Sequence, residues 1–497
     1  MPRALLGLLA GLVGYAELFS WIQPVFRASG EHPVFALAAI FILALYLALY
    51  LAVFVVLVPA HWDVAAVAGC AAAWVLLELL RSWAMTGFPW ALLGHTQYQV
   101  LPLIQVAEIG GVYLVGFSVV WCNLAIAALV TAWMRRESSA ASIRPIVLFV
   151  CIIAVQACYG FVRLHAVESV GRSAGSEGTS ATRVVLLQPN IDQYQKWDDR
   201  YVAQIRDTFR AMVREAAASR NPVGARGGAV LFVWPESAVP GYLFEDPELM
   251  GWLRGLISES VALAEGPVHH LIGAVGAAGS GKSWNMAVLF DGSGNARGLY
   301  RKIRLVPFGE FVPMKNLIGS LVGVVNQLGE FEAGTEKVVF RTNGSMPPFC
   351  ALICYESLFP CLTADFVRSG ADVLINITND GWYLETDCPY QHYSFNVFRA
   401  IETRRYLLRA ANTGISAVVA PSGRSRTTTL MTRSVLETIL VPRANAADTV
   451  YVHTAQWHWV LYACGAGAAM WIRRKQNRAQ PPDTRREEYA AYNSRHV

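Results

Sequence analysis

The sequence predicts a bundle of transmembrane helices joined to an α/β domain, and three observations support this fold class. The 497-residue chain is 54% hydrophobic and 15% charged, whereas a soluble domain carries about 25% charged residues. Long apolar runs fill the first third of the chain and recur near its end. Between them, short β-branched runs alternate with helical stretches, which is the pattern of an α/β domain.

Residues 1–167 are predicted to form about five transmembrane helices. A spanning helix needs about 20 apolar residues, and the apolar runs are 4–24, 33–59, 64–80, 102–134 and 144–165. The fourth run is longer than a bilayer requires, so we expect it either to extend beyond the bilayer or to bend near Gly110-Gly111. A signal peptide is the alternative for the first run, but no clear small-x-small cleavage site follows it.

The remaining segments follow from composition. Residues 168–182 are rich in Gly, Ser and Thr and are predicted to be a linker. The α/β domain is assigned to residues 183–445, with strands expected at 184–187, 230–233 and 373–375 and helices at 200–218 and 392–411. A C-terminal transmembrane helix is predicted within 446–475, and residues 476–497 form a polar tail.

The positions of the basic residues predict the orientation in the membrane. Arg3 precedes the first run, Arg135-Arg136 follow the fourth, and residues 473–475 (Arg-Arg-Lys) follow the last. With five spans before the domain and one after it, all three clusters fall on one side, and basic loops remain cytoplasmic. The domain is therefore expected outside the cytoplasm.

Composition also argues against several other kinds of protein. A net charge of +5 is small for this length and does not suggest a nucleic-acid partner. The nine cysteines include no CxxC pair and no Cys/His cluster with zinc spacing.

Residues 276–283 match the phosphate-binding-loop pattern, but that motif needs a helix directly after it. Residues 284–290 instead indicate a strand, so we predict a β-hairpin loop here.

Three segments carry side chains suited to catalysis, although each is ambiguous alone. Glu236 follows an apolar strand that ends in Trp-Pro, where it could act as a general base. Lys302 lies in a basic cluster and could stabilise an oxyanion. Cys354 ends another apolar strand, as a nucleophile on a strand-to-helix turn would. The ordinary alternatives are a solvated glutamate, a surface lysine and a buried core cysteine.

Taken together, these segments resemble the nitrilase superfamily and, within it, the apolipoprotein N-acyltransferase family. The resemblance rests on Trp-Pro-Glu at 234–236, on Tyr-x-Lys-x-x-Leu-Val-Pro-Phe-Gly-Glu at 300–310 and on Ile-Cys-Tyr-Glu at 353–356. Residues 376–382 and 86–90 resemble two further motifs of that family. The family usually has more membrane spans before its catalytic domain, and the residues after Trp382 also depart from its pattern.

The resemblance implies a nitrilase-like α-β-β-α sandwich for 183–445, on the periplasmic side of a bacterial inner membrane. It makes Glu236 the base, Lys302 the stabiliser of the tetrahedral intermediate and Cys354 the nucleophile. Supporting or substrate-binding roles are implied for Glu310, Tyr355, Glu356 and Trp382; an ordinary packed aromatic is the alternative for Trp382.

The implied reaction is the last step of bacterial lipoprotein maturation. Cys354 takes an acyl group from a phospholipid, commonly phosphatidylethanolamine, and the thioester is then attacked by the N-terminal diacylglyceryl-cysteine of an apolipoprotein. No metal or organic cofactor is required. The rival functions are a membrane-tethered amidase or nitrilase and a non-catalytic membrane scaffold.

The apolar residues 317–325 between catalytic motifs are expected to form a membrane-facing lid, with buried core as the alternative.

Overall fold

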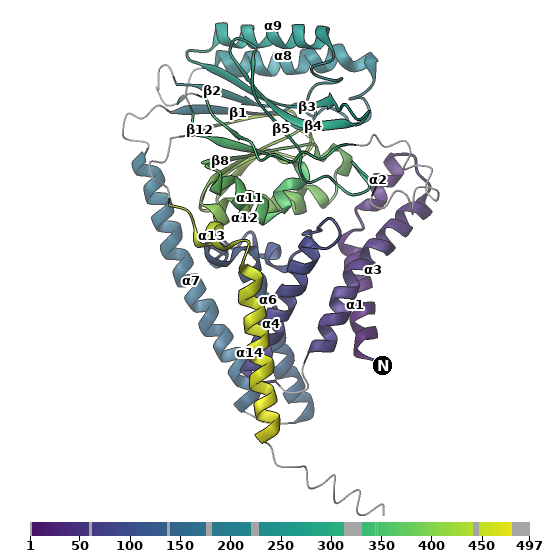
Figure 1. Ribbon diagram of the computed structural model, residues 1–497, viewed down its shortest axis with the longest axis vertical. Helices are drawn as coiled ribbons and strands as arrows, with labels where there is room; N and C mark the ends of the chain where they lie inside the picture. The colour runs from purple at the N-terminus through teal and green to yellow at the C-terminus, as the bar shows by residue number, and fades with distance from the viewer. Residues whose placement is uncertain are drawn as a thin grey trace, which may run out of the picture.

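The computed structural model describes residues 2–58, 62–136, 140–174, 181–219, 228–312, 331–342, 344, 346–440 and 447–479. Figure 1 shows a helical bundle on one side and two sheets with their covering helices on the other. The predicted fold class, a transmembrane bundle plus an α-β-β-α sandwich, is confirmed. The expected lid at 317–325 lies outside the described residues.

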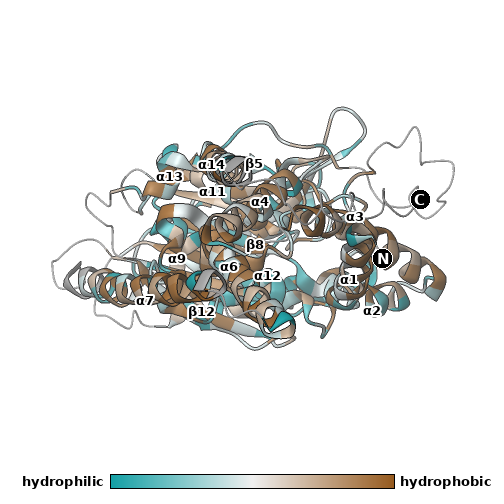
Figure 2. Cartoon of the chain, turned by 90° about the horizontal axis from the view of Figure 1, so that it is seen from below, coloured by the Kyte–Doolittle hydropathy of each residue, from teal (hydrophilic) through white to brown (hydrophobic). Residues whose placement is uncertain are grey.

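The bundle is built from apolar helices that match the predicted runs. Four segments are long and apolar enough to cross a membrane: α3 (Pro33–Leu57), α4 (Val64–Trp83), α6 (Ala107–Arg135) and Ile143–Ser169 of α7 (Ala140–Ala174). A fifth candidate is the pair α1 (Arg3–Leu18) and α2 (Ile22–Ala28), which is bent by 48°. Figure 2 shows hydrophobic residues over much of these helices.

Glycines set two close contacts in the bundle. A Cβ atom on Gly11 of α1 would lie 2.7 Å from Ala48 of α3, so the two helices pack closely. The expected bend in the fourth run is present, because Gly111 interrupts α6 with φ +64° and ψ −173°. A Cβ atom there would lie 2.4 Å from the ring of Tyr451 in α13 (Val450–Thr454).

Two boundaries differ from those expected. Helix α7 continues to Ala174 and so occupies the first residues of the predicted linker. Helix α14 (His458–Ala479) extends past residue 475 and packs beside α4, where a Cβ atom on Gly69 would lie 2.4 Å from Ala469. Its apolar part ends at residues 473–475 (Arg-Arg-Lys). Among the described residues, α14 is not one of the candidate membrane-spanning helices, and its role as a transmembrane helix stays a prediction.

Two six-stranded sheets form the centre of the α/β domain. The first has the order β12-β1-β2-β3-β4-β5, with β1 (Thr182–Gln188), β2 (Val230–Val233), β3 (Val268–Ala277), β4 (Ser283–Asp291), β5 (Ala296–Arg301) and β12 (Ser434–Leu440). The second has the order β11-β10-β9-β8-β7-β6, with β6 (Val339–Phe340), β7 (Phe349–Ile353), β8 (Val373–Thr378), β9 (Tyr406–Ala411), β10 (Ala417–Val419) and β11 (Ser425–Thr427). In each sheet three adjacent strands are parallel.

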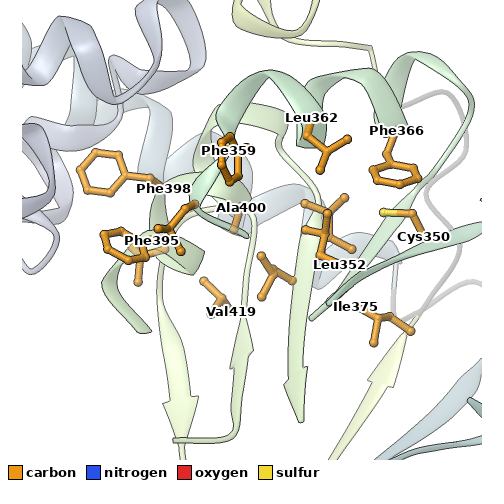
Figure 3. Packing of buried hydrophobic residues seen from close by; sticks show 14 of the residues in the cluster. Cys350, Leu352, Phe359, Leu362, Phe366, Ile375, Phe395, Phe398, Ala400 and Val419 are labelled. Carbon is orange, nitrogen blue, oxygen red and sulfur yellow. The ribbon is translucent and has the colours of Figure 1, made fainter. Parts of the chain in front are cut away.

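Helices cover the outer face of each sheet. In Figure 1, α8 (Val202–Ala218) and α9 (Pro247–Leu263) cover the first sheet, and α11 (Pro360–Arg368) and α12 (Cys388–Thr403) lie between the second sheet and the bundle. Strand β1 alternates: Val184 and Leu186 belong to the core between the sheets, whereas Val185 and Leu187 pack with α8 and α9. Figure 3 shows side chains of α11 over those of β7.

Two local predictions have clear outcomes. The helix expected over 392–411 is wrong beyond Thr403, because Arg404 adopts a left-handed conformation, φ +52°, and β9 follows it. Residues 276–283 join β3 to β4 in an antiparallel hairpin, as expected. No helix follows them, so they do not form a phosphate-binding loop.

Candidate active site

The three candidate catalytic residues lie beyond the ends of strands from both sheets. Glu236 follows β2, Lys302 directly follows β5, and Cys354 directly follows β7. The structure brings them together: Lys302 Nζ lies 3.3 Å from Glu236 Oε1, and the Cys354 thiol interacts electrostatically with both groups. All three side chains are buried. Three residues that are far apart in the sequence therefore share one water-poor site.

Lys302 and Asn285 bridge two carboxylates. Lys302 Nζ donates to Glu310 Oε1 at 2.9 Å in addition to its contact with Glu236. Asn285 Nδ2 donates to the same two oxygens, at 2.7 Å for Glu236 and 2.9 Å for Glu310. The backbone N–H of Asn379 donates to Glu236 Oε2 at 3.0 Å. Glu236 is thus held on both oxygens, which pre-organises it to accept a proton in one direction.

The electrostatics fix the resting protonation states. Burial alone would lower the pKa of Lys302, but the nearby carboxylates of Glu310 and Glu236 raise it, so the side chain is an ammonium. Burial and the Glu236 carboxylate raise the pKa of Cys354, and Lys302 only partly opposes them. The resting thiol is therefore protonated, and a thiol in this state needs a base before it can act as a nucleophile.

The nucleophile candidate sits in a strained turn. Cys354 begins the 3₁₀ helix η4 (Cys354–Leu358) with a φ of +51°. Such a conformation costs a non-glycine residue about 1–3 kcal/mol and occurs mainly at functional sites.

Glu356 ties this turn to the segment that carries Lys302. Its Oε2 accepts from the backbone N–H of Ile353 at 2.7 Å. Its Oε1 accepts from the N–H groups of Ile303 and Arg304, at 2.7 and 3.1 Å, and from the Tyr300 hydroxyl at 2.7 Å. Glu356 is fully buried, and these contacts all join it to other groups of the protein. Its supporting or substrate-binding role stays a prediction.

Comparisons with known proteins give the family to which the chain belongs. Residues 1–125 match the family model described as apolipoprotein N-acyltransferase N-terminal domain, and residues 183–431 match carbon-nitrogen hydrolase. A protein of Geobacter metallireducens named apolipoprotein N-acyltransferase is 34% identical over 94% of this chain and 85% of its own length. The chain belongs to the apolipoprotein N-acyltransferase family. A protein with that name from Allorhizobium ampelinum is 30% identical over 81% of this chain and 72% of its own length. Among solved structures, an amidase from Nesterenkonia sp. is similar over 53% of this chain and 92% of that chain, with 19% identity and a TM-score of 0.38.

In this member of the apolipoprotein N-acyltransferase family, the bundle directly contacts the turn that begins at Cys354. The Tyr355 hydroxyl donates to the carbonyl oxygen of Gly87, in the connection that follows α4, at 3.0 Å. Gly87 belongs to the 86–90 motif noted in the sequence. The two motifs are therefore parts of one contact between the bundle and the catalytic domain.

Trp382 does not have the environment of a packed core aromatic. It lies in the 3₁₀ helix η5 (Asp380–Tyr383) and is 45% exposed. Phe308, between Lys302 and Glu310, is also exposed, at 56%. These aromatic side chains provide apolar surface close in sequence to site residues, and a role for Trp382 in substrate handling stays a prediction.

Sequence reasoning missed several residues that hold the site. Asn285 lay in a predicted strand and carried no motif. Lys196 is buried and donates to the backbone carbonyl of Glu236 at 3.0 Å, and burial lowers its pKa to about 8. A buried lysine beside a catalytic carboxylate cannot be recognised from its neighbours in the sequence. Among the described residues, no group of three or more His, Cys, Asp and Glu side chains is arranged to hold a metal ion.

The role of Glu310 leads to a first prediction. Its Oε2 accepts from the N–H of Val306 at 2.8 Å, and its Oε1 holds the Lys302 ammonium. Glu310→Gln removes one of the two negative charges that face Lys302, while an amide oxygen can keep the contact. We expect about a tenfold loss of turnover, which corresponds to about 1.4 kcal/mol of transition-state stabilisation. The fold should stay intact, because the amide oxygen can still accept from Lys302. Full activity in this variant, measured by acylation of a lipopeptide, would reject the role.

Proposed function

We propose that this family member transfers an acyl group from a phospholipid to the α-amine of the diacylglyceryl-cysteine at the N-terminus of an apolipoprotein. The observation that carries the proposal is the buried cluster of Glu236, Lys302 and Cys354 in a chain of this family. A thiol, a fixed carboxylate and an ammonium are the groups needed for acyl transfer through a thioester.

In the first half of the reaction, Glu236 accepts the thiol proton as Cys354 Sγ attacks the ester carbonyl carbon. The Lys302 ammonium stabilises the negative charge on the carbonyl oxygen of the tetrahedral intermediate. The ester C–O bond then breaks, and the leaving oxygen takes the proton from Glu236. A lysophospholipid departs and the acyl group remains on sulfur.

In the second half, the α-amine of the acceptor attacks the thioester carbon. Glu236 accepts a proton from the amine, and Lys302 again stabilises the oxyanion. The C–S bond breaks, an amide is formed, and the Cys354 sulfur recovers a proton from Glu236. Phosphatidylethanolamine is the proposed donor.

The membrane part favours a lipid substrate over a small soluble amide. The catalytic domain rests on the bundle through α11, α12 and α13 (Figure 1). The hydroxyl of Tyr355, which is next to the nucleophile in the sequence, donates a hydrogen bond to the carbonyl oxygen of Gly87 in the membrane part. A membrane-tethered amidase would need neither feature, so hydrolysis of soluble amides is the less favoured function.

The decisive experiment is an acyl-transfer assay with purified enzyme in detergent micelles. The donor is phosphatidylethanolamine and the acceptor is a diacylglyceryl-cysteine lipopeptide. We expect an N-acylated lipopeptide and lysophospholipid in equal amounts. Release of free fatty acid or hydrolysis of simple amides, without an acylated lipopeptide, would overturn the proposal.

The proposed location is the bacterial inner membrane with the catalytic domain on the periplasmic side. In support, α1 begins and α6 and α14 end on the side of the bundle away from the sheets (Figure 1). Arg3 begins α1, Arg135-Arg136 end α6, and residues 473–475 lie in the last third of α14. Reporter fusions after Ser180 should therefore report the periplasm, and fusions after Ser138 should report the cytoplasm. The same compartment for both fusions would refute this orientation.

A further inference from the structure

Three side chains hold the carbonyl oxygen of Cys354. His392 Nε2 lies 3.2 Å from this oxygen, Ser357 Oγ donates to it at 3.2 Å, and Asn376 Nδ2 donates at 3.4 Å. A carbonyl oxygen only accepts hydrogen bonds, so the Nε2 atom of His392 carries its hydrogen. Because Cys354 has a φ of +51°, its conformation persists only where the surroundings fix it.

The other ring nitrogen of His392, Nδ1, contacts Arg409 and Asp380. Arg409 Nη2 lies 3.2 Å from His392 Nδ1 and 2.6 Å from Asp380 Oδ2. A guanidinium only donates and a carboxylate only accepts, so Nδ1 either accepts from Arg409 in a neutral ring or donates to Asp380 in a charged ring, and the Nε2–H group is present in both states. Asp380 Oδ1, 3.0 Å from the same Nδ1, accepts from the Thr378 hydroxyl at 3.1 Å. Burial and the Arg409 charge lower the pKa of His392, in agreement with a neutral ring.

The membrane part completes the enclosure of this ring. The indole of Trp90, which lies between α4 and the 3₁₀ helix η1 (Leu93–Gln97), packs on His392 with ring centroids 5.8 Å apart. Trp90 Nε1 donates to Gln391 Oε1 at 2.8 Å. Both Trp90 and His392 are buried. The imidazole therefore cannot swing away from Cys354 without disturbing the contact between the bundle and α12.

We infer that His392 is a positioning residue whose Nε2–H group fixes the carbonyl of Cys354 and thereby the direction of the nucleophilic sulfur. The inference rests on the proposed role of Cys354 as the nucleophile. His392 touches no substrate and transfers no proton. The competing explanation is purely structural: the ring fills space beside Trp90 and offers an acceptor to Arg409.

Two substitutions separate these explanations, because each keeps only one of the two hydrogen-bonding groups of the imidazole. His392→Gln places an amide N–H near the Nε2 position and keeps the donor to Cys354. His392→Asn places a side-chain oxygen near the Nδ1 position and keeps the acceptor for Arg409, but loses that donor. We expect the rate of Cys354 acylation by phosphatidylethanolamine to fall at least about tenfold in His392→Asn. In His392→Gln it should stay within about threefold of the wild-type rate, and the apparent affinity for phospholipid should change in neither variant.

Acylation rates are compared only for variants that fold and elute as a monodisperse peak. Wild-type acylation rates in His392→Asn, or an equally slow His392→Gln, would overturn the inference. If His392→Asn does not fold, His392→Leu replaces it with the same expected loss, since leucine packs on Trp90 but donates nothing.

A lipid-independent readout separates failure of this inference from failure of the proposed function. An unacylated wild-type enzyme would overturn the proposed function alone. The rate at which iodoacetamide alkylates Cys354 then becomes the measure. The inference predicts slower alkylation in His392→Asn than in His392→Gln, and equal rates would contradict it.

Discussion

Replacing Cys354 by alanine is expected to lower the rate of lipopeptide acylation by at least about 10⁴-fold, because covalent catalysis is impossible without the sulfur. The thiol is buried and lies within the electrostatic influence of Glu236 and Lys302. Loss of one sulfur atom leaves the strand end and its backbone hydrogen bonds in place, so the protein should still fold. The rate is measured in detergent micelles with phosphatidylethanolamine as donor.

Cys388→Ala is the matched control for this substitution. Cys388 is also a free, buried cysteine, at the first position of α12. It matches no catalytic motif, so turnover in Cys388→Ala should remain within about threefold of wild type, with a modest loss of stability from the small cavity. Normal turnover in Cys354→Ala, or an inactive but folded Cys388→Ala, would contradict the assignment.

Lys302→Met is expected to lower turnover by about 10²–10³-fold, the usual cost of removing an oxyanion-stabilising group. The substitution keeps the length and apolar stem of lysine but removes its charge. It also leaves Glu236 and Glu310 facing each other without the ammonium that separates them. Breaking a buried ion pair in this way costs about 3–5 kcal/mol, so the melting temperature should fall as well.

A double variant separates the loss of catalysis from the loss of stability. Lys302→Met/Glu310→Gln removes the second carboxylate charge and should recover part of the lost stability. Turnover should remain as low as in Lys302→Met alone, because the oxyanion still lacks its cation. Recovery of turnover together with stability would show that Lys302 acts only on the fold.

The membrane part could be predicted because lipid imposes a simple rule on sequence. Apolar runs of sufficient length matched α3, α4, α6 and α7, and Gly110-Gly111 marked the bend in α6. Helix ends were less predictable. The segment after α12 continued a helical pattern, yet the left-handed conformation of Arg404 ended the helix and β9 formed instead. Pairing of β9 with β8 and β10 depends on distant residues that local propensity does not include.

The candidate site was predictable only in part, for a related reason. Glu236 and Cys354 follow apolar strands, Lys302 follows β5 in a basic cluster, and the edge of the sheets brings the three together. The groups that hold them come from elsewhere: Asn285 from the middle of β4 and His392 from a helix. Their contacts depend on the packing of two sheets and a membrane bundle, which no local sequence pattern encodes.

Peptide mapping after incubation with phospholipid alone tests the central claim most directly. Without an amine acceptor the reaction should stop at the acyl-enzyme, and neutral hydroxylamine should release the acyl group as expected for a thioester. Mass spectrometry should place the acyl group on Cys354 and not on Cys350, Cys361 or Cys388. An acyl group on any other residue, or the absence of a covalent adduct in an enzyme that still acylates lipopeptides, would contradict the mechanism.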